Sequence, residues 1–153
     1  MRTLGLDYGT KTIGVAASDA LGLTAQTVTT IRRTSLKADL AALKALVEEY
    51  EVDRFVVGFP LNMDGTEGPR AEATRKFVDA LTQALGLPVE LWDERLSTVA
   101  AQRTLLEADL SRAKRREVID QMAAQFILQG WLDARHPPSS RDAYDDGDDD
   151  PEP

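Results

Sequence analysis

Residues 3–18 have the sequence TLGLDYGTKTIGVAAS, which predicts two short strands joined by a tight turn. Residues 3–7 are small and apolar and end in Asp-Tyr-Gly, a pattern typical of a strand that runs into a turn. Residues 12–18 are β-prone, so we expect a second strand, paired with the first across the turn at 8–11. Residues 24–32 are rich in Thr and Val and predict a third strand. Together they make an antiparallel meander.

Helices and strands alternate after the meander. Ser35 can cap a helix over about 36–50, and residues 53–59 have the continuous apolar core of a strand buried on both faces. Residues 60–68 predict a loop, Pro69 begins a helix to about 85, and residues 89–92 predict a short strand. We then expect a helix capped by Ser97 or Thr98 to about 107, a basic linker, and a last helix over about 117–134. This order predicts an α/β fold with a mixed five-stranded sheet, three antiparallel plus two parallel strands, flanked by helices.

Acidic residues are concentrated at the end of the chain. The net charge is −8, but residues 142–153 hold seven of the 26 acids and no Lys or Arg. The rest of the chain therefore holds 19 acids against all 18 basic residues, so local basic clusters can still bind nucleic acid. We predict one domain over residues 1–136 and a disordered acidic tail over 137–153.

Several classes of site are excluded by the residues that are missing. The chain has no cysteine, which excludes disulfides, zinc–thiolate sites and cysteine nucleophiles. Its one histidine, His136, lies just before the acidic tail, so a Ser-His-Asp triad is not expected. No apolar run is long enough for a signal peptide or a membrane span. We expect a soluble cytoplasmic protein with no membrane partner, whose chemistry depends on carboxylates, basic side chains and backbone amides.

Three acids are candidates for that chemistry. Asp7 and Glu94 each follow an apolar strand, at the end of a strand where sites gather in α/β sheets, and Asp120 lies among apolar residues of the last helix. Each has a simpler alternative: Asp7 begins a turn, Asp93 or Glu94 pairs with a nearby arginine such as Arg95, and Asp120 interacts with a helix dipole. Neighbouring strand residues point to opposite faces, so Asp93 and Glu94 are not both expected in one site.

A divalent cation would allow three such acids to lie close together. Carboxylates brought together repel, and hard oxygen ligands favour Mg²⁺ or Mn²⁺. Such ions activate water and stabilise the oxyanions of a phosphodiester, which needs neither histidine nor cysteine. Two basic clusters are candidates for holding phosphates, with a solvated surface as the alternative for both. They are Arg32-Arg33 and the set Arg112, Lys114, Arg115 and Arg116.

Four stretches of the chain resemble the YqgF-type family of ribonuclease H-like proteins. They are LGLDYGTKTIGVAASD (4–19), VVGFPLNMDGTEG (56–68), LWDERLST (91–98) with Ala101, and VIDQMAAQFIL (118–128). Members of this family are named as Holliday junction resolvases and as pre-16S ribosomal RNA processing nucleases. The resemblance covers about residues 3–134. It implies a ribonuclease H-like fold and a metal-dependent nuclease that hydrolyses structured nucleic acid, in pre-16S rRNA 5′-end processing (ribosome biogenesis) or in junction resolution (DNA recombination and repair).

The resemblance also implies roles for individual residues. Asp7 of the DYG motif, Glu94 of the DER motif and Asp120 are the implied metal ligands, with Asp93 as a substitute for Glu94. Lys11 and Asn62 are implied to lie near the phosphate, and Arg95 is a further candidate for substrate binding. The family pattern has Arg after this Lys where the chain has Thr12, so no substrate contact is implied at that position.

Two other functions remain open from the sequence. One is a non-catalytic module that binds nucleic acid or ribosome-assembly partners. The other is an actin-like phosphate-binding ATPase module, because Asp-x-Gly-Thr after a strand also resembles the first phosphate loop of such proteins, although no second copy of the fold is present. The oligomeric state is open between monomer and homodimer, since symmetric cutting of a four-way junction needs two active sites.

Overall fold

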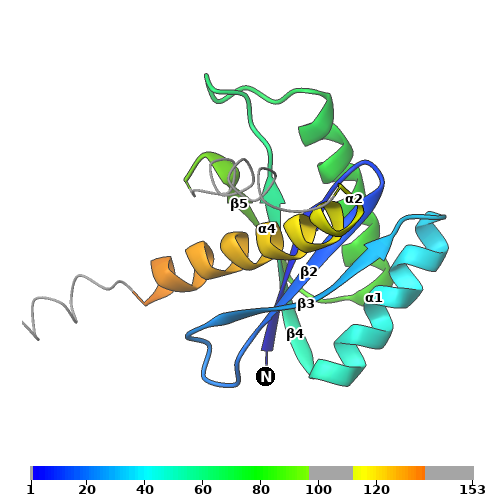
Figure 1. Cartoon of the computed structure of the whole chain (residues 1–153), viewed down its shortest axis with the longest axis vertical. Helices are drawn as coiled ribbons and strands as arrows, with labels where there is room; N and C mark the ends of the chain where they lie inside the picture. Colours follow the sequence, from blue (N-terminus) through cyan, green and yellow to red (C-terminus); the bar gives the residue numbers. More distant parts are fainter. Residues whose placement is uncertain (1, 97–111, 137–153) are drawn as a thin grey trace, which may run out of the picture.

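The computed structural model of the chain describes residues 2–96 and 112–136, which form a five-stranded sheet with helices on both faces (Figure 1). The sheet has the order β3-β2-β1-β4-β5. Its antiparallel part consists of β1 (Arg2–Tyr8), β2 (Thr12–Ser18) and β3 (Ala25–Arg32). The strands β4 (Val52–Phe59) and β5 (Val89–Asp93) extend it in parallel. The predicted mixed sheet is confirmed.

Two helices cover one face of the sheet. Helix α1 (Leu36–Tyr50) begins after Ser35, whose Oγ accepts a 3.1 Å hydrogen bond from the Ala38 amide. Helix α2 (Pro69–Leu85) ends at Gly86, which adopts a left-handed φ of 68° that glycine allows at little cost. The sequence predicted both helices, with Ser35 as the cap of the first and Pro69 as the first residue of the second. Their buried side chains pack on the β1 and β2 side chains of this face in the larger hydrophobic cluster.

Helix α4 (Arg112–Arg135) lies across the opposite face, as Figure 1 shows. Its fully buried Ala124, Ile127 and Leu128 pack on small sheet residues such as Ala16. A Cβ atom at Gly5 of β1 would lie only 2.7 Å from the Leu128 Cβ. Small residues on this face of the strands therefore allow α4 to lie unusually close to the sheet.

The beginning of α4 corrects one prediction. We expected a basic linker up to about residue 116, but the helix already begins at Arg112. Arg and Lys are good helix formers, and no Gly or Pro interrupts this segment, so helical propensity explains the difference. The helix predicted between Ser97 and about 107, and the predicted tail at 137–153, lie outside the described residues. Within the described part of the chain, no helix has the length and apolarity that a membrane span requires.

Candidate active site

Asp7 lies at the carboxyl end of the central strand β1, between two glycines on the neighbouring strands. Its side chain is buried, with 6% of its surface exposed. It pairs in register with Gly14 of β2. On the other side, Leu6 pairs with Val57 of β4, which places the next residue, Gly58, beside Asp7. All three face α4, because the preceding residues on β1 and β4 face α1 and α2.

Gly14 leaves the space that α4 occupies at Asp120. A Cβ atom at Gly14 would overlap the backbone carbonyl of Asp120, so only glycine fits this position without a shift. The Thr12 hydroxyl, at the start of β2, donates a hydrogen bond to Asp120 Oδ2. The structure therefore brings Asp120 to the strand that lies directly beside Asp7.

The position of Asp120 within α4 excludes an interaction with the helix dipole as the reason for an acid there. Because α4 begins at Arg112, Asp120 lies in the third turn of the helix, and no acidic residue occupies the first turn. Stabilisation by the helix dipole acts within the first turn and does not account for an acid there. The contact with Thr12 and the closeness to Gly14 are the interactions that hold it.

Gly58 leaves the corresponding space for Glu94 on the other side of Asp7. Glu94 begins the short 3₁₀ helix η1 (Glu94–Leu96), directly after β5. Its Oε2 lies 2.7 Å from the position that a Cβ atom would take at Gly58, and Ile127 Cδ1 of α4 lies 2.5 Å from the same point. Asp7, Glu94 and Asp120 thus come from three separate elements to one end of the face that α4 covers.

Asp93, the substitute that the sequence left open, has a different partner. Arg95 donates to it through Nε at 3.1 Å and through Nη2 at 2.8 Å. The side-chain hydrogen bond from Arg95 lowers the pKa of Asp93 below its ordinary value. The alternative of a surface pair with Arg95 therefore holds for Asp93. Glu94 is the acid of this pair that lies against Gly58.

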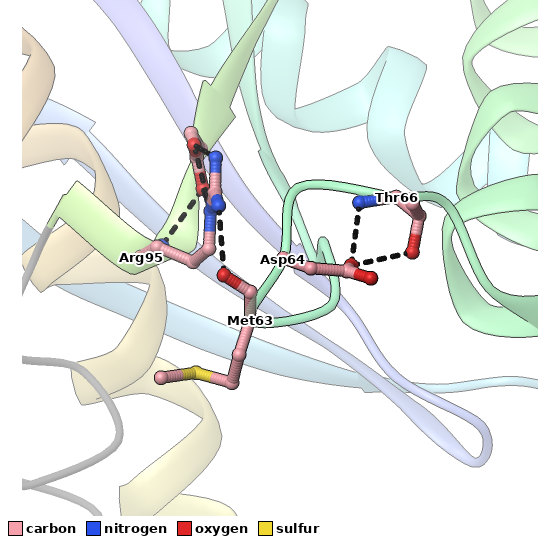
Figure 2. A network of polar contacts seen from close by, with 5 residues as sticks. Met63, Asp64, Thr66 and Arg95 are labelled. Atoms are coloured by element: carbon pink, nitrogen blue, oxygen red, sulfur yellow. Dashed lines mark hydrogen bonds and ion pairs between the residues drawn. The ribbon is translucent and has the colours of Figure 1, made fainter.

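Arg95 also connects η1 to the loop at 60–68. Its Nη1 donates to the Met63 carbonyl at 3.2 Å. Figure 2 shows this contact together with those by which Thr66 donates to Asp64 from both its amide and its hydroxyl. The hydroxyl of Thr66 lowers the pKa of Asp64. These contacts fix the loop beside Glu94, and they leave the Met63 side chain 91% exposed.

The predicted substrate-binding residues Lys11, Asn62 and Arg95 differ in the contacts that they make within the protein. Lys11 is exposed in the turn between β1 and β2, directly after the strand that carries Asp7. Asn62 is exposed in the loop at 60–68, where its Nδ2 donates to Thr66 Oγ1 at 2.9 Å. Arg95 shares its guanidinium between Asp93 and Met63.

In the predicted basic pair Arg32-Arg33, Arg33 stabilises the turn between β1 and β2. Its Nη1 donates to the carbonyls of Gly9 and Thr10, at 2.6 and 3.0 Å, and holds the turn after Asp7. Arg32 is exposed at the end of β3. The second cluster, Arg112, Lys114, Arg115 and Arg116, forms the first turns of α4, and its side chains lie outside what the structure describes.

The described side chains do not form a ready-made metal site. Across residues 2–96 and 112–136, no group of three or more His, Cys, Asp or Glu side chains is placed so that it could hold a metal ion. One oxygen of Asp120 is bound to Thr12. The donor set itself, three carboxylates around a buried strand end, has the chemistry that Mg²⁺ or Mn²⁺ prefers.

Sequence reasoning missed three residues that shape this site: Thr12, Gly14 and Gly58. In the sequence, Thr12 stands out only as a departure from the family pattern. The two glycines had a usable signal, because a glycine inside a strand often marks the close approach of a ligand or of another backbone. The pairing register that puts both beside Asp7 is long-range information that no local pattern contains.

Comparison with known proteins assigns the family. Residues 1–134 match the model of the RuvX family, described as Holliday junction resolvase. The chain belongs to the RuvX family. This confirms the resemblance to YqgF-type proteins that the four sequence stretches carry, and with it the predicted enzyme class, a hydrolase that acts on nucleic acid.

Relatives in the RuvX family match nearly the whole chain. A protein of Myxococcus xanthus (strain DK1622), named "Putative pre-16S rRNA nuclease", is 73% identical over 151 residues, which cover 99% of this chain and 100% of that protein. A protein of Symbiobacterium thermophilum with the same name is 64% identical over 142 residues, 92% and 99% of the two chains.

Solved structures confirm the predicted ribonuclease H-like fold. RuvC of T. thermophilus, in complex with a Holliday junction substrate, aligns with a TM-score of 0.57 at 15% identity, over 89% of this chain and 96% of that chain. The Fowlpox virus resolvase in complex with Holliday junction DNA aligns with a TM-score of 0.52 at 9% identity, over 88% and 99%. Similarity at these identities concerns the fold alone.

Proposed function

We propose that the chain is a divalent-metal-dependent nuclease that hydrolyses phosphodiester bonds in structured nucleic acid, with Asp7, Glu94 and Asp120 as its metal ligands. The observation that carries the proposal is the convergence of these acids around the end of β1. Glu94 lies against Gly58 and Asp120 against Gly14, on the two strands that flank Asp7. At both glycines, the close approach of a neighbouring element brings an acidic residue next to a strand that flanks Asp7.

The donor chemistry of these residues fits Mg²⁺ or Mn²⁺. A bound ion would relieve the repulsion between the carboxylates, activate a water molecule and stabilise the phosphate oxyanion. The chain's own contribution is positioning. Thr12 holds Asp120 from β2, and the pair of Asp93 with Arg95 fixes the segment that carries Glu94. Hydrogen bonds of this kind orient the ligands of a metal and are commonly needed for full affinity.

Phosphates of the substrate would be held by basic and amide side chains near this strand end. Lys11 follows Asp7 by four residues in an exposed turn, Asn62 lies in the loop at 60–68, and Arg95 contacts this loop at Met63. Their contacts with Thr66 and Met63 hold the loop in place, so substrate binding by this pair would use their remaining donors. We assign the helical cluster Arg112, Lys114, Arg115 and Arg116 to the same role, on its charge alone.

Precursor 16S ribosomal RNA is the substrate we propose first. Its support is the name of relatives that are 73% and 64% identical over nearly their whole length. A four-way DNA junction is the second candidate, and its support is the description of the RuvX family. We propose that the protein acts on either substrate in the cytoplasm, as a monomer or a homodimer.

Cleavage by wild type and Asp7→Asn tests this proposal. Each protein is incubated with end-labelled precursor 16S RNA and with a labelled four-way junction, in Mg²⁺, in Mn²⁺ or in EDTA. Asp53→Asn, an exposed acid at the far end of β4, is the matched control. We expect metal-dependent cleavage by wild type and Asp53→Asn but not by Asp7→Asn, and the substrate that is cut decides between the two candidates. Equal behaviour of all three proteins on both substrates would overturn the proposal in favour of a binding module.

A further inference from the structure

A groove lies on the face of the sheet opposite to the three acids, directly behind the same strand end. It has a volume of about 460 Å³ and lies between the beginning of α1, at Ser35 and Leu36, and the middle of α2, at Lys76 and Phe77. A smaller groove of about 250 Å³ continues it toward Arg70 at the beginning of α2. The two share Tyr8, Thr10, Arg33 and Ala73, so they form one continuous path past the turn at 8–11.

Three basic side chains line the groove: Arg33, Arg70 and Lys76. Arg33 donates to the carbonyls of Gly9 and Thr10, and Arg70 Nη2 donates to the Tyr8 carbonyl at 3.1 Å. Lys76 is exposed at its edge. Among the described residues, none of these three cations forms an ion pair with a carboxylate. The one acid of the lining, Asp39, is buried and accepts the Thr34 amide at 3.2 Å.

Apolar and aromatic side chains lie beside these cations. The ring of Tyr8 stacks on Phe77 with centroids 4.1 Å apart, and the Arg33 guanidinium lies 4.4 Å from the centre of the Tyr8 ring. Leu36 is 51% exposed at the edge of the groove. Phe77 and Arg33 therefore cover the Tyr8 ring, and Leu36 is the apolar side chain that the groove exposes. Cationic side chains beside apolar ones that contact bases are features by which proteins bind single-stranded nucleic acid. The volume also lies in the range of about 300–1,000 Å³ that small-ligand sites occupy.

The position of the groove connects it to the acids. Asp7 and Tyr8 are consecutive residues of β1, so their side chains point to opposite faces of the sheet. Asp7 faces α4, whereas Tyr8 faces α2 and lines the groove. A strand whose cleaved phosphate lies at Asp7 therefore has to pass only the turn at 8–11, with its exposed Lys11, to enter the groove.

From this geometry we infer that the groove between α1 and α2 binds a nucleotide of a single-stranded segment that adjoins the cleaved bond. Arg33, Arg70 and Lys76 bind its phosphates, and the apolar edge at Leu36 contacts its base. A duplex keeps its bases stacked inside and cannot offer one to a groove of this size. The inference rests on the proposed nuclease function, and it adds that the substrate has a single-stranded segment beside the cut.

A fluorescent label at the edge of the groove tests the inference directly. The chain has no cysteine, so Leu36→Cys can be labelled at one position with a dye that senses its environment. Leu21→Cys is the matched control, since Leu21 is also exposed, at 78%, but lies in the turn between β2 and β3. The full-length proteins are titrated in EDTA with a short single-stranded RNA, with a blunt duplex of the same sequence, and with a nucleoside monophosphate.

We expect a saturable change at position 36 with the single strand, at least tenfold weaker binding of the duplex and of the monophosphate, and no change at position 21. Equal binding of the duplex would overturn the inference. Equal binding of the monophosphate would do so as well, because it would indicate a site for a free nucleotide. No response at position 36 to any of the three would also overturn it.

Charge removal gives an independent readout. Lys76→Gln should weaken single-strand binding roughly fivefold and lower the slope of log affinity against log salt by about 0.7, the value for one phosphate contact. Lys44→Gln removes the same charge from an exposed position of α1 outside the groove and should change neither. An equal effect of both variants would overturn the inference. Cleavage of nucleic acid by wild type but not by Asp7→Asn, with no signal change from the label at position 36, would overturn the inference about the groove. That result would leave the proposed nuclease function supported.

Discussion

Gly58→Ala should impair catalysis far more than it impairs folding. The added Cβ would lie 2.5 Å from Ile127 Cδ1 and 2.7 Å from Glu94 Oε2, and real Cβ atoms essentially never lie within 3.0 Å of another group. Both neighbours are the ends of side chains, which can move by the roughly 0.5–1 Å required. Ile127 is fully buried, so its displacement should cost about 1–2 kcal/mol of stability.

The same substitution also displaces the Glu94 carboxylate from its position over Gly58. A misplacement of about 1 Å in an active site can lower the rate roughly 100-fold. We therefore expect cleavage by Gly58→Ala to fall about 100-fold, while its melting temperature falls by only about 3–6 °C. The assays are single-turnover cleavage in Mg²⁺, well below the melting temperature, and thermal unfolding followed by circular dichroism.

Gly22→Ala is the matched control for the loss of stability. Gly22 has a left-handed φ of 74° and open space around its Cβ position, so alanine there should cost about 1 kcal/mol through the backbone alone. It lies in the turn between β2 and β3, away from the acids. We expect wild-type cleavage from this variant. A wild-type rate in Gly58→Ala would refute the reasoning, because Glu94 would then not act from its position over Gly58.

Three further predictions concern side chains around the acids. Asp93→Asn should lower cleavage by less than tenfold, whereas Glu94→Gln should abolish it; the opposite result in the cleavage assay would exchange their roles. Thr12→Val should raise the Mg²⁺ concentration for half-maximal cleavage several-fold, because Asp120 loses the hydroxyl that orients it; an unchanged metal titration would contradict this. Arg95 lowers the pKa of Asp93, so the pair stabilises the fold above the ordinary carboxyl pKa of 3.8 and loses this effect as the pH falls through the lowered pKa. Urea unfolding of wild type and Asp93→Asn should therefore differ at neutral pH and converge in acid, and a difference that persists there would contradict it.

Local patterns in the sequence were sufficient for most of the fold. Ser35, Pro69 and Gly86 mark helix ends by their own backbone and side-chain chemistry, and the structure has helix ends at these positions. The apolar run before Phe59 predicted a buried strand for the same local reason. The start of α4 was missed because charged residues without a periodic apolar pattern resemble a linker, although their helix propensity is high.

The candidate site was only partly accessible from the sequence. Strand ends and the family resemblance pointed to Asp7, Glu94 and Asp120, but nothing local distinguished Asp93 from Glu94. That distinction comes from the pairing of Asp93 with Arg95 and from the space over Gly58. The groove behind Asp7 was not predicted at all. The fold brings its residues together from β1, α1 and α2. No regular spacing along the sequence therefore predicts the groove.

Binding of Mn²⁺ to the intact protein, measured by calorimetry, tests most directly whether Asp7, Glu94 and Asp120 form a metal site. Wild type, Asp7→Asn and the control Asp53→Asn are titrated without nucleic acid, after unfolding curves have shown that all three are folded. We predict saturable binding by wild type and Asp53→Asn and its loss in Asp7→Asn. Binding by Asp7→Asn with the affinity and stoichiometry of wild type would contradict the account, because the buried acid at the end of β1 would then hold no metal.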